Sequence, residues 1–137
     1  MKAIALDIGE RRIGVAKTDA LNITAQGLTT VTVRFNREKT VREVAELLEK
    51  EGADVLVVGL PRNMNGTEGP AAEGIRTFVE ELMEHIDLPV EYVDERLTTV
   101  SAQRVLLEGD VSRKKRKGVV DMMAATIILQ TWMDGKR

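Results

Sequence analysis

Residues 54–59, DVLVVG, restrict the fold more than any other segment, because this short run is apolar on both of its faces. Runs of this kind are typical of strands buried between two layers, as in parallel sheets that helices cover. A helix is predicted over 71–86 from its apolar stripe, and a further strand over 89–93. Because strand–helix–strand crossovers are right-handed, the two strands should lie parallel in one sheet.

The first forty residues predict three meandering strands that extend the same sheet. Residues 2–8 alternate with the two-residue period of a strand, and residues 12–18 follow after a short turn as a second strand. Residues 28–33 are rich in β-branched side chains and predict a third strand. Asn36 can cap a helix that we expect over 37–51.

The C-terminal third completes the predicted architecture. We expect a short helix at 99–108, a basic loop at 109–118 and a final helix at 119–133. Together these elements predict an α/β fold, a mixed five-stranded sheet with helices on both faces. The length and composition fit one globular unit, so residues 1–137 are predicted to form a single domain.

Composition excludes several kinds of chemistry. The chain has no cysteine and one histidine, which removes thiol catalysis, disulfide scaffolds, cysteine-based metal sites and multi-histidine sites. The first apolar stretch is interrupted by Asp7 and is too short for a signal peptide. No run approaches the roughly 18 apolar residues of a membrane span. We therefore expect a cytoplasmic protein with no membrane partner.

The formal net charge of -2, from 20 basic and 22 acidic residues, hides a segregated distribution. Both ends of the chain carry a basic excess, whereas residues 41–100 are strongly acidic. Basic clusters are typical of surfaces that bind phosphate, although a solvated surface loop is the alternative interpretation. The three clusters are Arg11 with Arg12, residues 34–39, and the five consecutive cations 113–117.

Acidic residues at the predicted strand ends and in the last helix suggest a metal site. Asp7 ends the first strand, and Asp94 and Glu95 follow the last one, where ligands bind in open α/β sheets. Asp121 lies beside alanines in a largely apolar helix, where a lone carboxylate is costly. Each also has a structural explanation, as a turn residue, a helix-capping acid or an exposed acid in a first helical turn. A cluster of carboxylates suits Mg²⁺ or Mn²⁺ and could hold paired metals against a phosphodiester.

The polar loop 59–69, GLPRNMNGTEG, follows a strand without matching a P-loop or a GxGxxG motif. Arg62 and Asn63 could contact a phosphate backbone from this loop, and a plain connector is the equal alternative. The chain has four aromatic residues, so no base-stacking platform is predicted. Recognition of nucleic acid should therefore rest on phosphates and shape.

Four of these segments resemble one known family. They are LDIGERRIGVAKTD (6–19), GLPRNMNGTEG (59–69), DERLTT (94–99) and RKKRKGVVDMMAATIILQ (113–130), in the motif order of the YqgF/RuvX family. The resemblance implies a ribonuclease H-like fold. It also implies a nuclease, described in this family as a Holliday-junction resolvase and, in bacteria, as an enzyme that matures the 5′ end of pre-16S rRNA.

The resemblance also implies roles for individual residues. Asp7, Glu95 and Asp121 would be the acids that bind the metal. Other resolvases of this fold carry an acid at the end of the fourth strand, where this chain has Gly59, so Glu95 would have to replace it and Asp94 stays the alternative. Taken with the basic clusters and the polar loop, the predicted nucleic-acid contacts are Arg11, Arg12, Arg62, Asn63, Arg96, Thr98, Arg113, Lys114, Lys115, Arg116 and Lys117.

We therefore expect a Mg²⁺- or Mn²⁺-dependent endonuclease that acts on structured nucleic acid. The expected substrate is the precursor rRNA of the small ribosomal subunit, with branched DNA as the alternative. Two other hypotheses stay open. One is a non-catalytic RNA-binding module for ribosome assembly. The other is a nucleotide-binding domain of the actin–hexokinase type, whose first strand also ends in Asp-x-Gly. The sequence does not distinguish a monomer from a homodimer.

Overall fold

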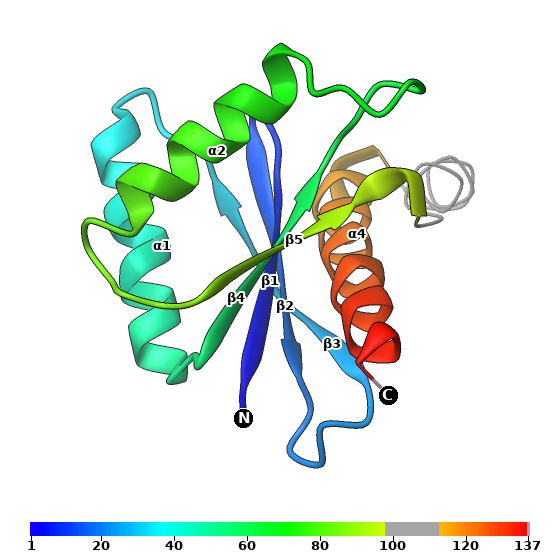
Figure 1. Ribbon diagram of the computed structural model, residues 1–137. Helices are drawn as coiled ribbons and strands as arrows, with labels where there is room; N and C mark the ends of the chain where they lie inside the picture. Colours follow the sequence, from blue (N-terminus) through cyan, green and yellow to red (C-terminus); the bar gives the residue numbers. More distant parts are fainter. Residues whose placement is uncertain (98–112, 137) are drawn as a thin grey trace.

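One five-stranded sheet organises the fold (Figure 1). The computed structural model describes the backbone of residues 1–97 and 113–136 and the side chains of residues 1–96 and 119–136. The strands are β1 (Ala3–Ile8), β2 (Arg12–Thr18), β3 (Ala25–Thr32), β4 (Val55–Leu60) and β5 (Val90–Asp94). Their order is β3-β2-β1-β4-β5, with β1, β4 and β5 parallel to one another and the β1–β2 and β2–β3 pairs antiparallel. The predicted mixed sheet is confirmed.

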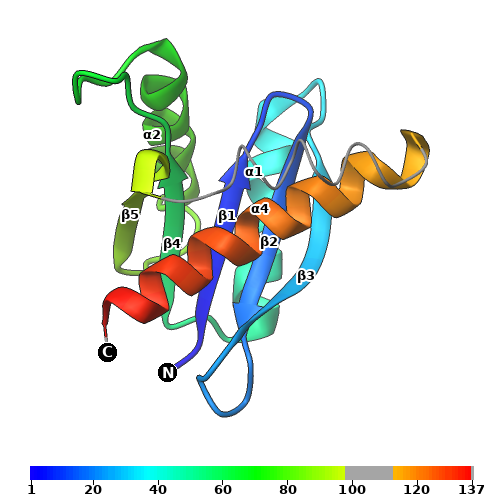
Figure 2. The same ribbon diagram turned by 90° about the vertical axis from the view of Figure 1, so that its right-hand side faces the viewer.

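Helices cover both faces of this sheet, as predicted (Figures 1 and 2). Helices α1 (Arg37–Glu51) and α2 (Pro70–Leu82) pack on one face, and α4 (Arg113–Gly135) crosses the other face diagonally. A 3₁₀ turn, η1 (Glu95–Leu97), follows β5. Among the described residues, no helix combines the length and apolar character needed to cross a bilayer.

Large aliphatic side chains fill the layer between the sheet and helices α1 and α2. Ile4 and Leu6 of β1 and Leu56 of β4 point into this layer and are completely buried, together with Leu48 of α1. The predicted bounds of α1 are confirmed because the local signals are strong. The Asn36 side chain accepts hydrogen bonds from backbone amides of the first turn.

Small residues line the opposite face, where α4 lies close to the strands. Ala5 of β1 and Ala124 of α4 belong to a second buried cluster on this side. A Cβ at Gly14 of β2 would collide with the backbone carbonyl of Asp121. The absence of a side chain at Gly14 therefore allows the backbone of α4 to contact the strand directly, at the turn that carries Asp121.

The start of the last helix differs from the sequence prediction. The expected basic loop over 109–118 is wrong for residues 113–118, which form the first turns of α4. Lys and Arg are good helix formers, and no glycine or proline interrupts the run before Gly118. Asp121 consequently lies in about the third turn of the helix, not in its first. Residues 109–112 and the short helix predicted at 99–108 lie outside the described residues.

Two smaller differences have packing as their cause. Strand β3 begins at Ala25, three residues before the prediction, because its weakly β-forming start pairs with the end of β2 and the Ala25 amide donates to Gln130 Oε1 at 3.0 Å. Helix α2 ends at Leu82, but Met83 and Ile86 still pack against the core from the turn that follows. Their apolar spacing imitates a continuing helix.

Candidate nuclease site

Asp7 lies near the carboxyl end of β1, on the face of the sheet that α4 covers. Its side chain is only 6% exposed. The residue opposite Asp7 in the β1–β2 ladder is Gly14, the glycine that contacts the Asp121 carbonyl. This cross-strand pair therefore brings Asp7 close to the turn of α4 that carries Asp121, although the two acids are far apart in the sequence.

Asp121 is held to the sheet by an ion pair. Arg12 Nε donates to Asp121 Oδ2 at 2.7 Å, with the Arg12 side chain 30% exposed and that of Asp121 16% exposed. Arg12 was predicted to contact nucleic acid, and in this structure its guanidinium pairs with Asp121, a predicted metal ligand. The helix position of Asp121 is thus fixed by a backbone contact at Gly14 and a side-chain contact at Arg12.

Glu95 reaches the same edge of the sheet from the turn that follows β5. Its Oε1 atom lies 2.9 Å from the position that a Cβ on Gly59 would occupy at the end of β4. Ile128 of α4 lies still closer to that position, so its side chain and the Glu95 carboxylate together occupy the space beside Gly59 on the α4 face of the sheet. An acid from the turn after β5 thus lies beside Gly59, the position at which β4 carries no acid.

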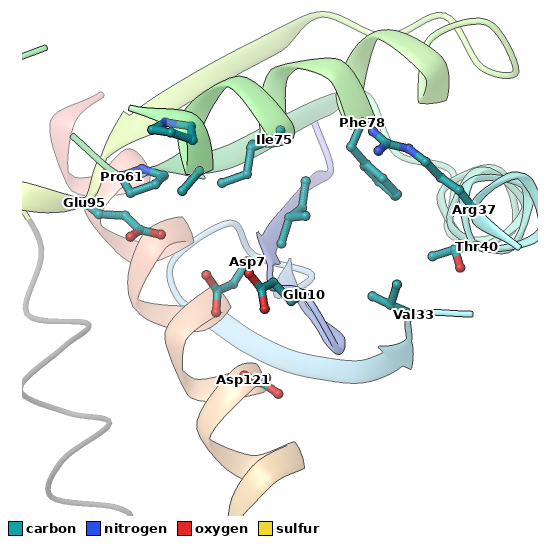
Figure 3. A pocket seen from close by; sticks show the side chains of 15 residues that line it. Asp7, Glu10, Val33, Arg37, Thr40, Pro61, Ile75, Phe78, Glu95 and Asp121 are labelled. Carbon is teal, nitrogen blue, oxygen red and sulfur yellow. The ribbon is translucent and has the colours of Figure 1, made fainter. Parts of the chain in front are cut away.

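The three acids line one groove at the carboxyl edge of the sheet (Figure 3). The groove has a volume of about 560 Å³, and Glu10 of the β1–β2 turn lines it as well. Figure 3 shows Glu95, Asp7 and Asp121 toward the α4 side, with Ile75 and Phe78 of α2 along another side. The far end is formed by Val33, Arg37 and Thr40. Sequence reasoning did not single out Glu10, whose only signal is its place in the turn after Asp7.

The donor set fits a hard divalent cation in its chemistry. Every candidate ligand is a carboxylate, the type of oxygen donor that Mg²⁺ and Mn²⁺ prefer. Within the described residues, however, no three acidic or histidine side chains converge closely enough to hold a metal ion. The acids thus share one groove, and coordination of a common ion requires a movement of their side chains.

Asp94, the alternative to Glu95, is engaged elsewhere. Arg96 donates to it from Nη2 at 2.7 Å and from Nε and the backbone amide, and Arg62 lies 3.9 Å from its Oδ2. The hydrogen bonds from Arg96 lower the pKa of the Asp94 carboxyl below its ordinary value. Asp94 is also absent from the residues that line the groove, whereas Glu95 is among them. The geometry favours Glu95 as the ligand.

Residues 61–69, the part of the polar loop 59–69 that follows β4, are held by hydrogen bonds within the loop. The Asn63 side-chain amide donates to Thr67 Oγ1 at 3.0 Å, and the backbone amide of Asn63 donates to the Thr67 carbonyl at 2.8 Å. Arg62 lies 3.7 Å from Glu68, which also binds Arg76 through two short hydrogen bonds. Asn63 therefore shapes the loop, while Arg62 and Arg96 remain partly exposed at its edge.

The structure describes the remaining predicted contacts to different extents. Arg11 lies exposed in the β1–β2 turn and makes no ion pair with any described residue. Thr98 lies outside the described residues. The cations Arg113, Lys114, Lys115, Arg116 and Lys117 are described only as backbone of the first turns of α4.

Solved structures define the class of this fold. The chain is similar to the structure of Thermus thermophilus RuvC in complex with a Holliday junction substrate, with a TM-score of 0.61 and 14% identity. The match covers 99% of this chain and 95% of that chain. A further Thermus thermophilus RuvC structure matches with a TM-score of 0.58 and 13% identity, covering 99% of this chain and 96% of the other. The fold is ribonuclease H-like, as in these resolvases.

Sequence comparisons define the family. The family described as "RuvX: Holliday junction resolvase" matches residues 1–135. A Moorella thermoacetica protein named "Putative pre-16S rRNA nuclease" is 52% identical over 134 residues, which cover 98% of this chain and 95% of the relative. A Geobacillus kaustophilus protein of the same name is 46% identical over 138 residues, the full length of both chains. The chain belongs to the RuvX family, which confirms the resemblance found in its sequence.

Proposed function

We propose that this protein is a divalent-metal-dependent endonuclease that hydrolyses phosphodiester bonds in structured nucleic acid. Its membership of a family of resolvases and nucleases supports phosphodiester hydrolysis. The observation that carries the proposal is the groove lined by Asp7, Glu95 and Asp121, because these acids come from three separate elements and line one groove at the edge where ligands bind in open α/β sheets.

Asp7, Glu95 and Asp121 would hold Mg²⁺ or Mn²⁺ in this groove. When bound, the metal would supply Lewis-acid activation of the attacking water and of the scissile phosphate. The buried Asp7, fixed on the middle strand of the sheet, would provide a rigid ligand, and Glu95 would provide an oxygen from beside Gly59. Arg12 holds Asp121 and keeps a positive charge beside the groove, where it can also face a phosphate.

The proposed natural substrate is precursor 16S rRNA, cleaved at its 5′ end. The names of the relatives from Moorella thermoacetica and Geobacillus kaustophilus support this substrate. The protein would then act in the cytoplasm on the precursor of the small ribosomal subunit. Backbone contacts would come from Arg11, Arg62 and Arg96, which are exposed, and from the basic run 113–117 at the start of α4.

The test is cleavage of a precursor-16S fragment that carries the 5′ extension, by purified protein with Mg²⁺. We expect a defined 5′ product, and we expect the Asp7→Asn variant to lower the cleavage rate by roughly 100-fold or more. Asp87→Asn is the matched control, because Asp87 is exposed in the loop before β5, at the opposite edge of the sheet. Undiminished cleavage by Asp7→Asn, or cleavage that persists in EDTA, would contradict the proposal.

Two alternatives are decided by the same assay. A non-catalytic RNA-binding module is favoured by the separation of the acids within the described residues, and tight RNA binding without metal-dependent cleavage would select it. Branched DNA is favoured by the description of the family and by the RuvC neighbour. Faster cleavage of a four-way DNA junction than of the RNA fragment would select that substrate.

A further inference from the structure

Phe35 differs from every other aromatic side chain of the protein. Phe78, Tyr92 and Trp132 are all at least partly buried, and each lies beneath a basic side chain. Phe35 is fully exposed, at 109% of its reference area. Burial of a phenyl ring is favourable, so a ring left fully in water forgoes that free energy. A bound partner that covers the Phe35 ring would gain this free energy.

The backbone on both sides of Phe35 is fixed. The Arg34 amide donates to Oγ1 of the completely buried Thr40 at 2.7 Å. Asn36 caps α1 by accepting hydrogen bonds from the Glu38 and Lys39 amides at 3.0 and 3.4 Å. The ring is therefore presented from an ordered connection between β3 and α1, so binding to it requires little ordering of the backbone.

Phe35 stands at one end of the proposed nuclease groove. Val33 and Arg37, two residues to either side of it, both line that groove. The Val33 amide donates to the Arg11 carbonyl at 2.8 Å, so the β1–β2 turn, with Arg11 and Glu10, lies directly beside this connection. A strand of nucleic acid that passes the acids along the groove thus reaches the Phe35 connection at its far end.

The charges around Phe35 favour a phosphate backbone. Arg34 and Arg37 are occupied by Glu43 at 3.6 Å and Glu81 at 2.7 Å. Two further cations of this region make no ion pair with any described residue. They are Arg11 in the β1–β2 turn and Lys39 in the first turn of α1.

We propose that an unpaired base of the substrate stacks on Phe35, while Arg11 and Lys39 contact the adjoining phosphates. This inference rests on the proposed function, since it takes the substrate to be nucleic acid. It specifies that the substrate is single-stranded where it leaves the groove past β3, because bases inside a duplex have both faces covered by their neighbours. The sequence predicted no base-stacking platform from so few aromatics, and one correctly placed ring is enough for a single stacked base.

The test is binding in EDTA, where the proposed metal chemistry cannot proceed. The probes are a labelled oligoribonucleotide of about 12 nucleotides without self-complementarity, and the blunt duplex of the same sequence. We expect Phe35→Ala to weaken binding of the single strand roughly tenfold and to leave duplex binding within about twofold. Leu21→Ala is the matched control, because Leu21 is 74% exposed in the β2–β3 turn at the opposite edge of the sheet. It should change neither affinity.

A second variant reports stacking directly. We expect Phe35→Trp to retain single-strand affinity and to show tryptophan emission that the oligonucleotide quenches, whereas the wild type, with Trp132 alone, is not quenched. For single-strand binding, Lys39→Gln should lower the slope of log affinity against log salt concentration by roughly one. Lys50→Gln, at the other end of α1, should leave this slope unchanged.

The outcomes separate this inference from the proposed function. Three results would each overturn the stacking. Phe35→Ala could bind the single strand within twofold of the wild-type affinity, or it could lose equal affinity for single strand and duplex. The tryptophan emission of Phe35→Trp could also stay unquenched when the oligonucleotide saturates the protein. Cleavage of the precursor fragment could still occur in all three cases. Conversely, the oligonucleotide could quench the emission of Phe35→Trp while the wild-type protein cleaves nothing in Mg²⁺. That result would uphold the stacking and contradict the nuclease function.

Discussion

The two faces of the sheet use different residues for different tasks. Toward α1 and α2, the strands present large aliphatic side chains such as Leu6 and Leu56, which are completely buried. Toward α4, β1 and β2 present alanine and glycine while β4 and β5 present valines, and the helix backbone touches the strand at Gly14. Apolar area contributes most of the stability of a packed layer, whereas a close approach fixes the relative position of two elements. We conclude that one face mainly stabilises the fold and that the other positions the acids.

Leu56→Ala should have the largest effect on stability. It removes a completely buried side chain from the inner strand β4, and such substitutions lower the free energy of unfolding by roughly 2–5 kcal/mol. Urea denaturation measures this loss. Because Leu56 faces away from α4, cleavage well below the unfolding midpoint should stay within about twofold of the wild-type rate. A much lower cleavage rate in the folded variant would break the division between the faces.

Gly14→Ala should reduce cleavage more than it reduces stability, the reverse of Leu56→Ala. The new methyl group would collide with the Asp121 carbonyl, and overpacking of this kind costs roughly 1–3 kcal/mol. Since the shift separates Asp121 from Asp7, we expect cleavage to fall further than the stability loss explains. Gly74→Ala, in α2, is a control for stability alone, because Gly74 lines the groove: a Cβ there meets nothing within 4 Å, so stability should rise by roughly 0.5–1 kcal/mol. Normal cleavage by Gly14→Ala would show that the close approach is not needed.

Arg12→Gln should have a smaller effect on stability. The Arg12–Asp121 pair is only partly buried, so its loss should cost about 1 kcal/mol, measured by urea denaturation. Arg42→Gln provides the comparison on the other face, because its pair with Glu38 is more than 60% exposed at both side chains. There we expect roughly 0.5 kcal/mol or less. Equal losses from the two variants would mean that the Arg12 pair adds nothing specific to the docking of α4.

The smallest expected effect is a pH dependence at Asp94. Because Arg96 lowers the pKa of Asp94, the folded state favours the ionised carboxylate, and this stabilisation is present at neutral pH. It is lost as the pH falls from about 4 through the lowered pKa. The difference in Tm between the wild type and Asp94→Asn should therefore narrow between about pH 7 and pH 3. A difference that stays constant over that range would show that the carboxylate charge is not the stabilising feature.

The two adjacent acids where β5 ends, Asp94 and Glu95, can also be compared by activity. We expect Asp94→Asn to retain metal-dependent cleavage, since Asp94 is bound by Arg96 and lies outside the groove, and Glu95→Gln to lose it. Single-turnover cleavage rates distinguish the two variants. If Asp94→Asn lost cleavage and Glu95→Gln kept full activity, Asp94 would be the metal ligand and Glu95 would not.

Much of the fold was predictable because its signals are local. The apolar run 54–59 and the alternation of 2–8 identified buried strands, and the cap at Asn36 identified the start of α1. The start of α4 was mispredicted because five adjacent cations suggest a solvated loop, although Lys and Arg also favour helix. Charge patterning describes the surface of a segment and carries little information about its backbone.

The candidate site was predictable only in its individual residues. Asp7, Glu95 and Asp121 stood out by position, whereas the contacts that arrange them join distant parts of the chain. The Arg12–Asp121 pair spans 109 residues, and the place of Glu95 above Gly59 depends on how β5 continues into η1 beside β4. Phe35 was overlooked because exposure cannot be inferred for one aromatic residue between two strongly predicted elements.

The most direct test of the central claim is a crystal structure of the protein soaked with Mn²⁺, read by anomalous difference density. We expect a peak in the groove, bound by carboxylate oxygens of Asp7, Glu95 and Asp121, with Arg12 displaced from Asp121 where the metal takes its oxygen. An occupied Mn²⁺ site elsewhere, for example at Asp94 and Glu68, with no density between the three acids would contradict it.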